Sequence, residues 1–387
     1  MKLNATFLLM IGVVLVGANA FVLSPILPEV AASLHTTPAH VTRATASFGA
    51  ATALSALILA AQIDRQGVRR SLAVSAAVLA LAQVFSLFAQ GWLGLAMAQA
   101  LAGAAVGVML PAIYAATTAT ARPGQETARL GRVLTGWALS LVLAVPVSAW
   151  MTEHLGWRPV YGILATISGL VSIGMWHSLP KGMSKGVAKA LPIRHGPLHA
   201  LRLPGVPFIL GLSLMYMTAF YGTYAYFGEG IRSALNLSAS GAGFYVLVYG
   251  LGFGVAGLCA GRVRIPNGRG YMVALFSLIA LTYLAWRYSI GHAGLAMLNI
   301  ALWGFFNQFA LNAMILALNK RAPDARGAVM GLNSAVTYSA VFAGPLLMGL
   351  LYPGYGFRGV ATLAAACVGL AALALALRPR RHFTPSS

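Results

Sequence analysis

The sequence predicts an all-α membrane protein of 12 transmembrane helices, arranged as two six-helix repeats with both termini in the cytoplasm. Three observations predict this class: the scarcity of charge, the spacing of the apolar runs and the distribution of Lys and Arg. Of the 387 residues, 59% are apolar and 8% are charged, and the mean hydropathy is +0.79. A soluble domain carries about 25% charged residues, and over half of its surface faces water. The composition therefore excludes a soluble enzyme, a disordered chain and a secreted disulfide scaffold.

Cysteine and histidine usage excludes further classes. The two cysteines, Cys259 and Cys367, both lie inside apolar runs, which excludes a disulfide framework and a Cys-rich metal site. The eight histidines form no HExxH motif, and no Ser, His and acid set lies at one depth of the predicted helices. We expect neither an enzyme nor a bound cofactor or metal.

Twelve apolar runs are each long enough to cross the hydrocarbon layer as a helix. The first six are 7–27, 41–63, 71–89, 93–119, 133–151 and 159–179, and the second six are 207–228, 239–261, 271–289, 293–318, 328–351 and 359–377. The connection between the sixth and the seventh run is longer than the others. It carries three Lys, two Arg and no acid, with Pro and Gly throughout, which predicts a mobile basic linker. The predicted domains are an N-terminal bundle (1–180), a cytoplasmic linker (181–206) and a C-terminal bundle with a short tail (207–387).

The cations predict the orientation. The chain has 26 Lys and Arg against 6 Asp and Glu, a formal charge of +20, which in a soluble protein would indicate a nucleic-acid binder. Of the 26 cations, 21 fall in alternate loops that become cytoplasmic when both termini lie inside, as the positive-inside rule requires. The five cations of the outer loops are Arg43, Arg158, Arg232, Arg287 and Arg358. The predicted partners are therefore a lipid bilayer and a small-molecule substrate, not nucleic acid.

The N-terminus offers one alternative. Lys2, the first apolar run and Ala18-Asn19-Ala20 imitate a cleavable signal peptide. Cleavage would leave eleven spans and break the internal repeat, so we expect the segment to be retained.

The two halves repeat at an offset of about 200 residues. Gly156-Trp157-Arg158 opens the sixth predicted helix, and Gly356-Phe357-Arg358 opens the twelfth. The other matched pairs are Pro123 with Pro323, Glu29 at the end of helix 1 with Glu229 at the end of helix 7, and Gly136, Ser140, Ala144 and Pro146 with Ala335, Ser339, Ala343 and Pro345. A parallel repeat of six helices is a transporter architecture.

The loop after the second predicted helix carries a motif, Asp64-Arg65-Gln66-Gly67-Val68-Arg69-Arg70. It resembles the cytoplasmic signature of the major facilitator superfamily, with Ala60 standing where the signature begins with Gly. In physical terms Gly67 permits a tight turn, and Asp64 can pair with Arg or with a helix N-terminus. The alternative is a plain positive-inside loop. The resemblance implies a cytoplasmic gate formed by Asp64, Arg65, Gly67, Arg69 and Arg70.

Three further segments are similar to the drug and sugar efflux branch of that superfamily, whose members are proton antiporters. They are Phe21–Pro28, helix 5 with Gly136 and Pro146, and Pro323–Gly327 leading into Gly331–Ser334. The resemblance covers the whole chain. It implies a substrate path lined by helices 1, 4, 7 and 10.

Departures from the branch bear on proton coupling. Ala144 and Ser148 stand where the helix 5 pattern has Gly, and Gln99 stands where many relatives place an Arg. Many relatives also carry an acid near Asn19 and Ala20. An intramembrane acid is the usual proton carrier, and no Asp or Glu falls clearly at mid-membrane here. This scarcity argues against a standard proton-coupled mechanism.

Polar and aromatic residues within the apolar spans are the candidate cavity lining, because such groups tend to face the bundle interior. The candidates are Asn19, Gln99, Tyr114, Tyr221, Tyr224, Trp303, Asn307, Asn333 and Tyr338. The alternative for each is packing or a hydrogen bond to a neighbouring helix, worth about 1 kcal/mol or less. Amides, Tyr and Trp without fixed charge suit a neutral or amphipathic substrate.

Glu29 and Glu229 form a matched pair at predicted outer helix ends. If the two ends approach each other, their carboxylates could share a proton. The alternative is that both are solvated helix ends.

The sequence thus predicts a monomeric exporter of a small neutral or amphipathic organic compound, working by alternating access with proton antiport in a bacterial inner membrane. Uptake or facilitated diffusion without proton coupling is an alternative on the same fold. A non-transporting sensor or scaffold is a remote third.

Overall fold

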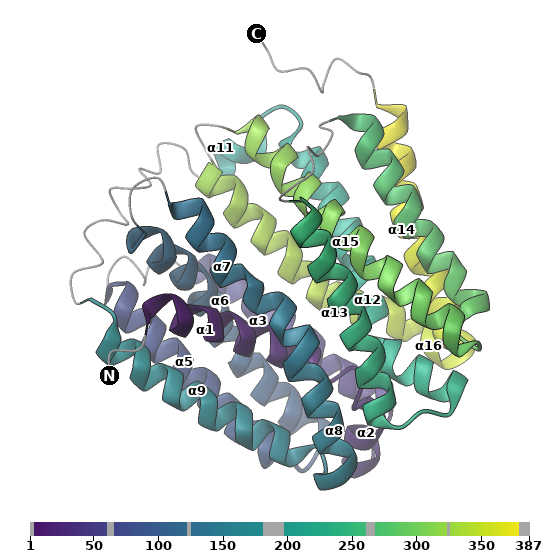
Figure 1. The fold of residues 1–387 in the computed structure, drawn as a ribbon, viewed down its shortest axis with the longest axis horizontal. Helices are drawn as coiled ribbons and strands as arrows, with labels where there is room; N and C mark the ends of the chain where they lie inside the picture. Colours follow the sequence, from purple (N-terminus) through teal and green to yellow (C-terminus); the bar gives the residue numbers. More distant parts are fainter. Residues whose placement is uncertain are drawn as a thin grey trace. The chain divides into compact units, whose positions relative to one another are not determined.

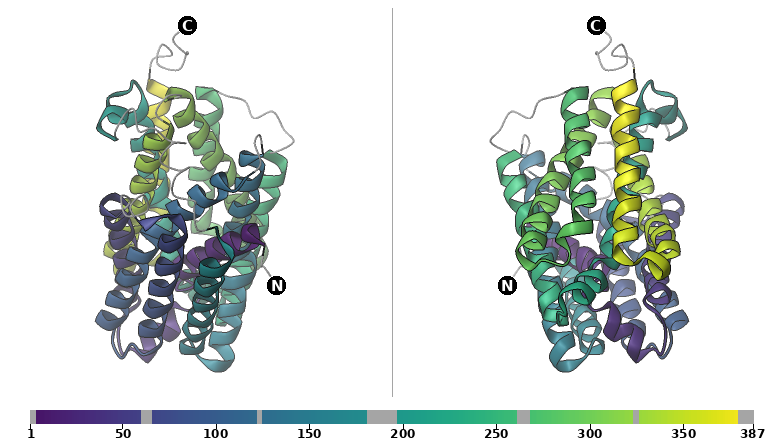
Figure 2. Two further views of the ribbon diagram at one scale, coloured as in Figure 1. Left: turned by 90° about the vertical axis from the view of Figure 1, so that its left-hand side faces the viewer. Right: turned by 90° about the vertical axis from the view of Figure 1, so that its right-hand side faces the viewer.

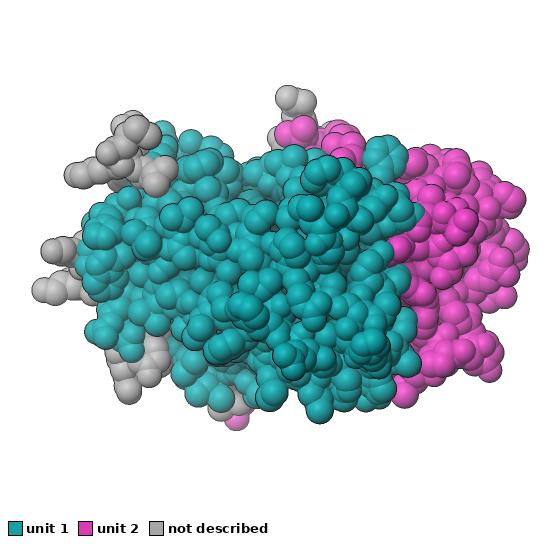
Figure 3. All heavy atoms as spheres, turned by 90° about the horizontal axis from the view of Figure 1, so that it is seen from below, with its two compact units in different colours: residues 1–192, 238–244 teal, residues 193–237, 245–387 magenta. Residues whose placement is uncertain are grey.

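The computed structural model describes residues 4–59, 66–121, 125–180, 197–260, 268–322 and 326–378. Throughout these ranges every regular element is a helix (Figure 1). The predicted all-helical class is confirmed. The chain divides into two compact units, residues 1–192 with 238–244 (unit 1) and residues 193–237 with 245–387 (unit 2), shown in Figure 3. The predicted domain boundaries, the count of 12 spans and the cytoplasmic termini stay predictions.

The helices of unit 1 are α1 (Ala5–Phe21), α2 (Leu27–Ser33), α3 (Pro38–Ile58), α5 (Val68–Leu87), α6 (Trp92–Ala119), α7 (Glu126–Leu139), the π-helix η1 (Ser140–Ala144), α8 (Val145–Leu155) and α9 (Arg158–Ser178). Those of unit 2 are α11 (Pro197–Arg202), α12 (Val206–Leu235), α14 (Arg269–Ser289), α15 (Ala293–Arg321) and α16 (Arg326–Leu377). Helix α13 (Ala239–Ala260) begins in unit 1 and continues in unit 2. In unit 2, α16 lies alongside α12 and α14 (Figure 2).

Helix length and apolarity agree with a membrane protein. Among the described residues, nine helices are long and apolar enough to cross a bilayer, and α1 is a shorter apolar helix. Helix α16 is 52 residues long and covers both of the last two predicted spans, with non-helical backbone at Gly356.

The first predicted span, 7–27, is wrong as a single helix. Helix α1 ends at Phe21, residues 22–26 form turns, and α2 starts at Leu27. The physical reason is proline: Pro25 and Pro28 have no N–H to donate, and proline disfavours helical backbone in the residue before it. Glu29 consequently lies in the first turn of α2 and does not end the first helix.

The fifth predicted span, 133–151, contains a bulge that the sequence pattern did not indicate. Helix α7 passes into η1, where the Val145 N–H donates to the Ser140 carbonyl. Pro146 follows directly and cannot donate a helical hydrogen bond. Single-turn π-bulges of this kind occur inside α-helices, frequently at functional sites.

Helix α12 runs seven residues beyond the predicted end of the seventh span, to Leu235. Asn236 closes it in the left-handed conformation (φ 54°), and its N–H donates to the Arg232 carbonyl. Asn is one of the few residues that adopt this conformation readily. Glu229 therefore lies inside α12, and the prediction that it ends the helix is wrong.

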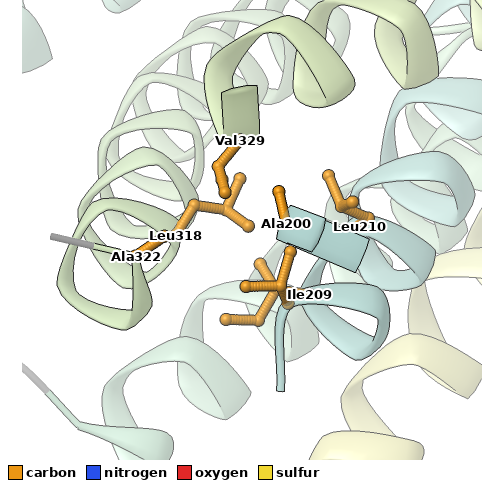
Figure 4. Packing of buried hydrophobic residues seen from close by; sticks show 7 residues of the cluster. Ala200, Ile209, Leu210, Leu318, Ala322 and Val329 are labelled. Carbon is orange, nitrogen blue, oxygen red and sulfur yellow. The ribbon is translucent and has the colours of Figure 1, made fainter. Parts of the chain in front are cut away.

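Part of the predicted mobile linker is a packed helix. Residues 181–196 lie outside the described residues, but Pro197–Arg202 forms α11. Its Ala200 is fully buried in a cluster with residues of α12, α15 and α16 (Figure 4). The members of that cluster are Ala200, Val206, Ile209, Leu210, Leu318, Ala322 and Val329. The last ten residues of the linker are thus anchored to unit 2 by apolar burial.

The two units repeat the same close helix packing. A Cβ on Gly103 of α6 would overlap the Phe48 carbonyl oxygen of α3, and a Cβ on Gly304 of α15 would overlap the Tyr249 carbonyl oxygen of α13. The two glycines are separated by the repeat offset, and so are their two partners. Only glycine permits two helix backbones to come this close.

The segments Gly156-Trp157-Arg158 and Gly356-Phe357-Arg358 also share local geometry. Gly156 (φ 84°) and Gly356 (φ 57°) both adopt positive φ, where glycine is favoured. Trp157 and Phe357, which follow them, are both buried. In unit 1 the Arg158 guanidinium donates to Ser33 Oγ (2.8 Å) and to the Ala89 carbonyl (3.0 Å). The repeat predicted from the sequence is therefore present in the local geometry.

The glycine contacts predict a stability effect. Gly103→Ala and Gly304→Ala should each destabilise the protein by about 1–3 kcal/mol, because the added methyl forces two backbones apart. Gly169→Ala and Gly254→Ala are matched controls, because nothing lies within 4 Å of a Cβ there, and alanine is the better helix former. Thermal unfolding in detergent is the measurement. Equal melting temperatures for the Gly103 and Gly169 variants would contradict the prediction.

Candidate functional site

The predicted cytoplasmic gate is described only in its second half. Asp64 and Arg65 lie outside the described residues. Gly67 has φ 82° and immediately precedes α5, which agrees with the tight turn expected of it. The Arg69 guanidinium lies 4.7 Å from the centre of the Trp176 ring, and Arg70 is exposed. Arg69 therefore ties the start of α5 to α9 by a cation–π contact.

Two of the candidate residues in unit 1 contact each other directly. Asn19 of α1 and Gln99 of α6 are both buried, and Asn19 Nδ2 donates to Gln99 Oε1 at 2.9 Å. Gln99 Nε2 donates in turn to Ser86 Oγ and to the Tyr161 hydroxyl, both at 3.3 Å. One glutamine thus connects α1, α5, α6 and α9.

The direction of these bonds fixes how the Asn19 amide points. Ser86 Oγ donates to the Ala82 carbonyl, so towards Gln99 it can only accept. Gln99 therefore directs Nε2 to Ser86 and Oε1 to Asn19. Asn19 must then direct Nδ2 to Gln99, which leaves Asn19 Oδ1 buried without a partner among the described residues. A buried acceptor of this kind calls for a donor that the described residues do not supply.

The other candidates in unit 1 lie where α1, α6 and α7 meet. Tyr114 shares a side-chain hydrogen bond with Trp137, and the Trp137 ring meets Phe21 edge-on at 6.1 Å. Tyr114 and Trp137 are both half-buried. Gly136 allows α7 to approach α1, because a Cβ there would lie 2.7 Å from the Met10 carbonyl oxygen. The sequence pattern did not single out Trp137.

In unit 2, Asn307 is the centre of a second network. Its Oδ1 accepts from the Tyr216 hydroxyl at 2.9 Å, and its Nδ2 donates to the Tyr249 hydroxyl at 3.0 Å. All three residues are buried. Tyr249 was not among the predicted site residues. It occupies the repeat position of Phe48, and that offset could have placed it against α15.

Trp303 of α15 lies in an aromatic cluster and not on an open surface. Its indole is surrounded by four rings at 5.1–6.2 Å, those of Phe220, Phe227, Tyr249 and Tyr283. Tyr224 is buried and packs on Phe220 at 5.9 Å, and the half-buried Tyr221 meets Phe220 at 5.0 Å. The structure thus brings Tyr221, Tyr224 and Trp303 together around Phe220.

The two remaining cavity candidates of unit 2 lie on α16. Asn333 is half-buried and accepts from Ser213 Oγ at 3.3 Å, and Tyr338 is buried. Glu229 is half-buried in α12, where its Oε1 accepts from Ser233 Oγ at 3.4 Å, and Glu29 is half-buried in α2.

The buried polar side chains share one property. Among the described residues with buried side chains, all polar ones are Asn, Gln, Ser or Thr, and none carries a formal charge. Within the same residues, no group of three or more His, Cys, Asp or Glu could hold a metal ion. Both hydrogen-bonded networks are therefore built from neutral groups.

Comparison with known proteins identifies the family. Residues 9–228 and 208–387 each match the sequence profile of the Major Facilitator Superfamily. The chain belongs to the major facilitator superfamily. Each match covers about one half of the chain, in agreement with the internal repeat.

Individual members of the superfamily are similar over nearly the whole chain. The uncharacterized MFS-type transporter YwfA of Bacillus subtilis (strain 168) is 25% identical over 366 residues, which is 92% of this chain and 88% of YwfA. A bacterial homolog of the human lysosomal transporter Spinster, crystallised in an inward-facing and unoccupied conformation, has a TM-score of 0.79 at 15% identity, covering 99% of this chain and 98% of that one. The human organic anion transporter MFSD10 (TETRAN) has a TM-score of 0.67 at 14% identity, covering 96% and 98%.

The family assignment confirms the resemblance to the superfamily, whereas the drug and sugar efflux branch stays a prediction. The protein is a multi-pass membrane protein with the major facilitator fold and its two repeats, and its function is of the transporter type. The similarity to the two solved structures concerns the fold alone, because their sequences are 14–15% identical to this chain.

The Gln99 network predicts a loss of stability on substitution. Gln99→Leu should cost about 1–3 kcal/mol, because it removes the acceptor of Asn19 and the donor to Ser86 and Tyr161, leaving buried polar groups unpaired. Gln90→Leu is the matched control, because Gln90 is exposed in the connection after α5. Thermal unfolding of the purified variants is the measurement. A Gln99→Leu variant as stable as Gln90→Leu would contradict the role assigned to the network.

Proposed function

We propose that this major facilitator protein is a secondary active transporter that exports a small neutral or amphipathic organic compound. It works by alternating access, with proton antiport, as a monomer in a bacterial inner membrane. The cytoplasmic motif with Asp64, Arg65, Gly67, Arg69 and Arg70 acts as the gate on the inner side.

One observation supports the proposed substrate class. The buried polar side chains of the described residues are all neutral. A strongly charged ligand would lose its hydration without a buried counter-charge, which is costly. A ligand with hydroxyl, amide or aromatic groups instead finds amide and phenol partners and ring faces to stack on.

Asn19 is the contact we propose for a hydrogen-bond donor of the substrate. Its Oδ1 is buried and lacks a partner, and Gln99 fixes its direction. Tyr114, on the same helix as Gln99, and Tyr221 and Tyr224 in unit 2 supply further phenol groups. Trp303, Asn307, Asn333 and Tyr338 complete the proposed lining.

Proton coupling is proposed to run through Glu29 and Glu229. Among the described side chains the acids are Glu29, Glu153 and Glu229. Glu29 and Glu229 are half-buried and occupy matched repeat positions, whereas Glu153 is exposed.

A second candidate function is a carrier without proton coupling, working in uptake or facilitated diffusion. The neutrality of both buried networks favours it, because an amide or a hydroxyl does not change its protonation state near neutral pH. Transport measured in right-side-out and inverted vesicles separates export from uptake.

Ligand stabilisation tests the substrate class. Neutral or amphipathic compounds should raise the melting temperature of the purified protein, since binding adds RT ln(1 + [L]/Kd), about 2.7 kcal/mol at a ligand concentration of 100 Kd. Strongly charged compounds should not. Asn19→Ala should lose most of the shift, while Gln90→Ala, at an exposed position, keeps it. A screen in which only organic ions stabilise the protein would overturn the proposal.

Substitution of Glu29 tests proton coupling. Glu29→Gln should reduce pH-gradient-driven transport in proteoliposomes about tenfold, because glutamine cannot take up and release a proton. Substrate counterflow, which moves no net protons, should persist in the same variant. Glu29→Asp is the control that keeps the carboxyl group. Full gradient-driven transport by Glu29→Gln would exclude Glu29 as the coupling residue and favour the uncoupled carrier.

A further inference from the structure

Helix α13 begins at a carboxylate that belongs to another helix. Glu153 lies near the end of α8, and its Oε2 accepts from the Ser240 backbone N–H at 3.0 Å. The Ser238 hydroxyl accepts from the Gly241 N–H at 3.3 Å and shares a hydrogen bond with the Glu153 carboxylate. The first N–H groups of a helix have no partner within it and attract negative charge. Glu153 therefore caps α13 from outside.

The same turn of α13 packs closely on α8. A Cβ on Gly243 would lie 2.7 Å from Ala149 Cβ and 3.3 Å from Pro146 Cα. Gly243 is buried, whereas Glu153 is exposed at the edge of the contact. Two interactions thus hold the first turn of α13 against α8: the solvent-accessible Glu153 cap and the close packing of Gly243 on Ala149 and Pro146.

The boundary between the two compact units falls within α13, just after the turn that contacts α8. Residues 238–244 group with unit 1, although the rest of α13 belongs to unit 2. The helix is assigned without interruption from Ala239 to Ala260. A movement between the units must therefore either bend α13 or detach its first turn from α8. Detachment breaks the exposed carboxylate cap, which is a weak interaction in water, and separates Gly243 from Ala149 and Pro146.

We propose that Glu153 is a latch: it holds the first turn of α13 against α8, and this contact opens and closes in each transport cycle. The second half of this statement rests on the proposed alternating-access function. The first half concerns the contact alone and can be tested without a substrate.

Cysteine labelling tests the contact. In a C259A/C367A background, S240C keeps the backbone N–H and reports exposure of the first turn to a membrane-impermeant maleimide. Glu153→Ala should speed labelling about threefold. Glu153→Gln, which keeps an acceptor but loses the charge, should fall between. S233C in α12 is the control reporter, and its rate should not change. An unchanged S240C rate, or an equal rise at S233C, would overturn the latch.

Cross-linking tests whether the latch must open. E153C/S240C in the same background should form a disulfide on oxidation and lose transport about fivefold, with recovery on reduction. Each single-cysteine variant should be unaffected by the same treatment. Full transport by the cross-linked protein would overturn the required opening, and if no disulfide forms, the labelling result alone decides the contact. If the parent protein transports no tested compound, the labelling result still decides the contact, so the two failures are distinguishable.

Discussion

A buried polar group in a bundle of apolar helices must find its partner inside the protein, because the lipid offers none. This constraint determines how the described helices of each unit are held together. In unit 1 the Gln99 amide binds three helices besides its own, through Asn19, Ser86 and Tyr161. In unit 2 the Asn307 amide does the same for α12 and α13 through Tyr216 and Tyr249. Each unpaired member would cost about 1–3 kcal/mol, so the partners fix helix rotation as well as distance.

Such bonds form only if the helices lie close together, and glycine residues at the helix contacts allow this short distance. Gly103 lies one turn after Gln99 on α6, and Gly304 lies about one turn before Asn307 on α15. Both bring their helix into backbone contact with a neighbour, α3 in one unit and α13 in the other. Because the two members of each pair are three or four residues apart, the amide and the glycine lie on the same face of one helix. This pairing of an amide with a close backbone contact is what the repeat preserves, while the particular residues differ.

The helices were predictable because apolar length and loop charge reflect the membrane directly, and most of the described part of the predicted spans is helical. The breaks were less predictable. The turn at 22–26 follows from Pro25 and Pro28, but η1 depends on a hydrogen-bond register around Pro146 that composition does not encode. Helix α11 was missed because its burial depends on Leu318 and Val329, which are distant in sequence. The residue types of the candidate site could be predicted, but their contacts could not. The pairing of Asn19 with Gln99 depends on how both helices are rotated about their axes, which the sequence pattern does not show.

The two networks differ in a way that bears on transport. Both atoms of the Asn307 amide have side-chain partners, whereas Asn19 Oδ1 has none in the described residues. Unit 2 surrounds its amide with rings, and those rings fill the space around Trp303. A ligand that donates a hydrogen bond would therefore satisfy the Asn19 acceptor, which the described residues of unit 1 leave unpaired. Since neither network can hold a charge cheaply, any coupling to protons must act through carboxylates outside them, and would reach the ligand only by way of the helices that carry both.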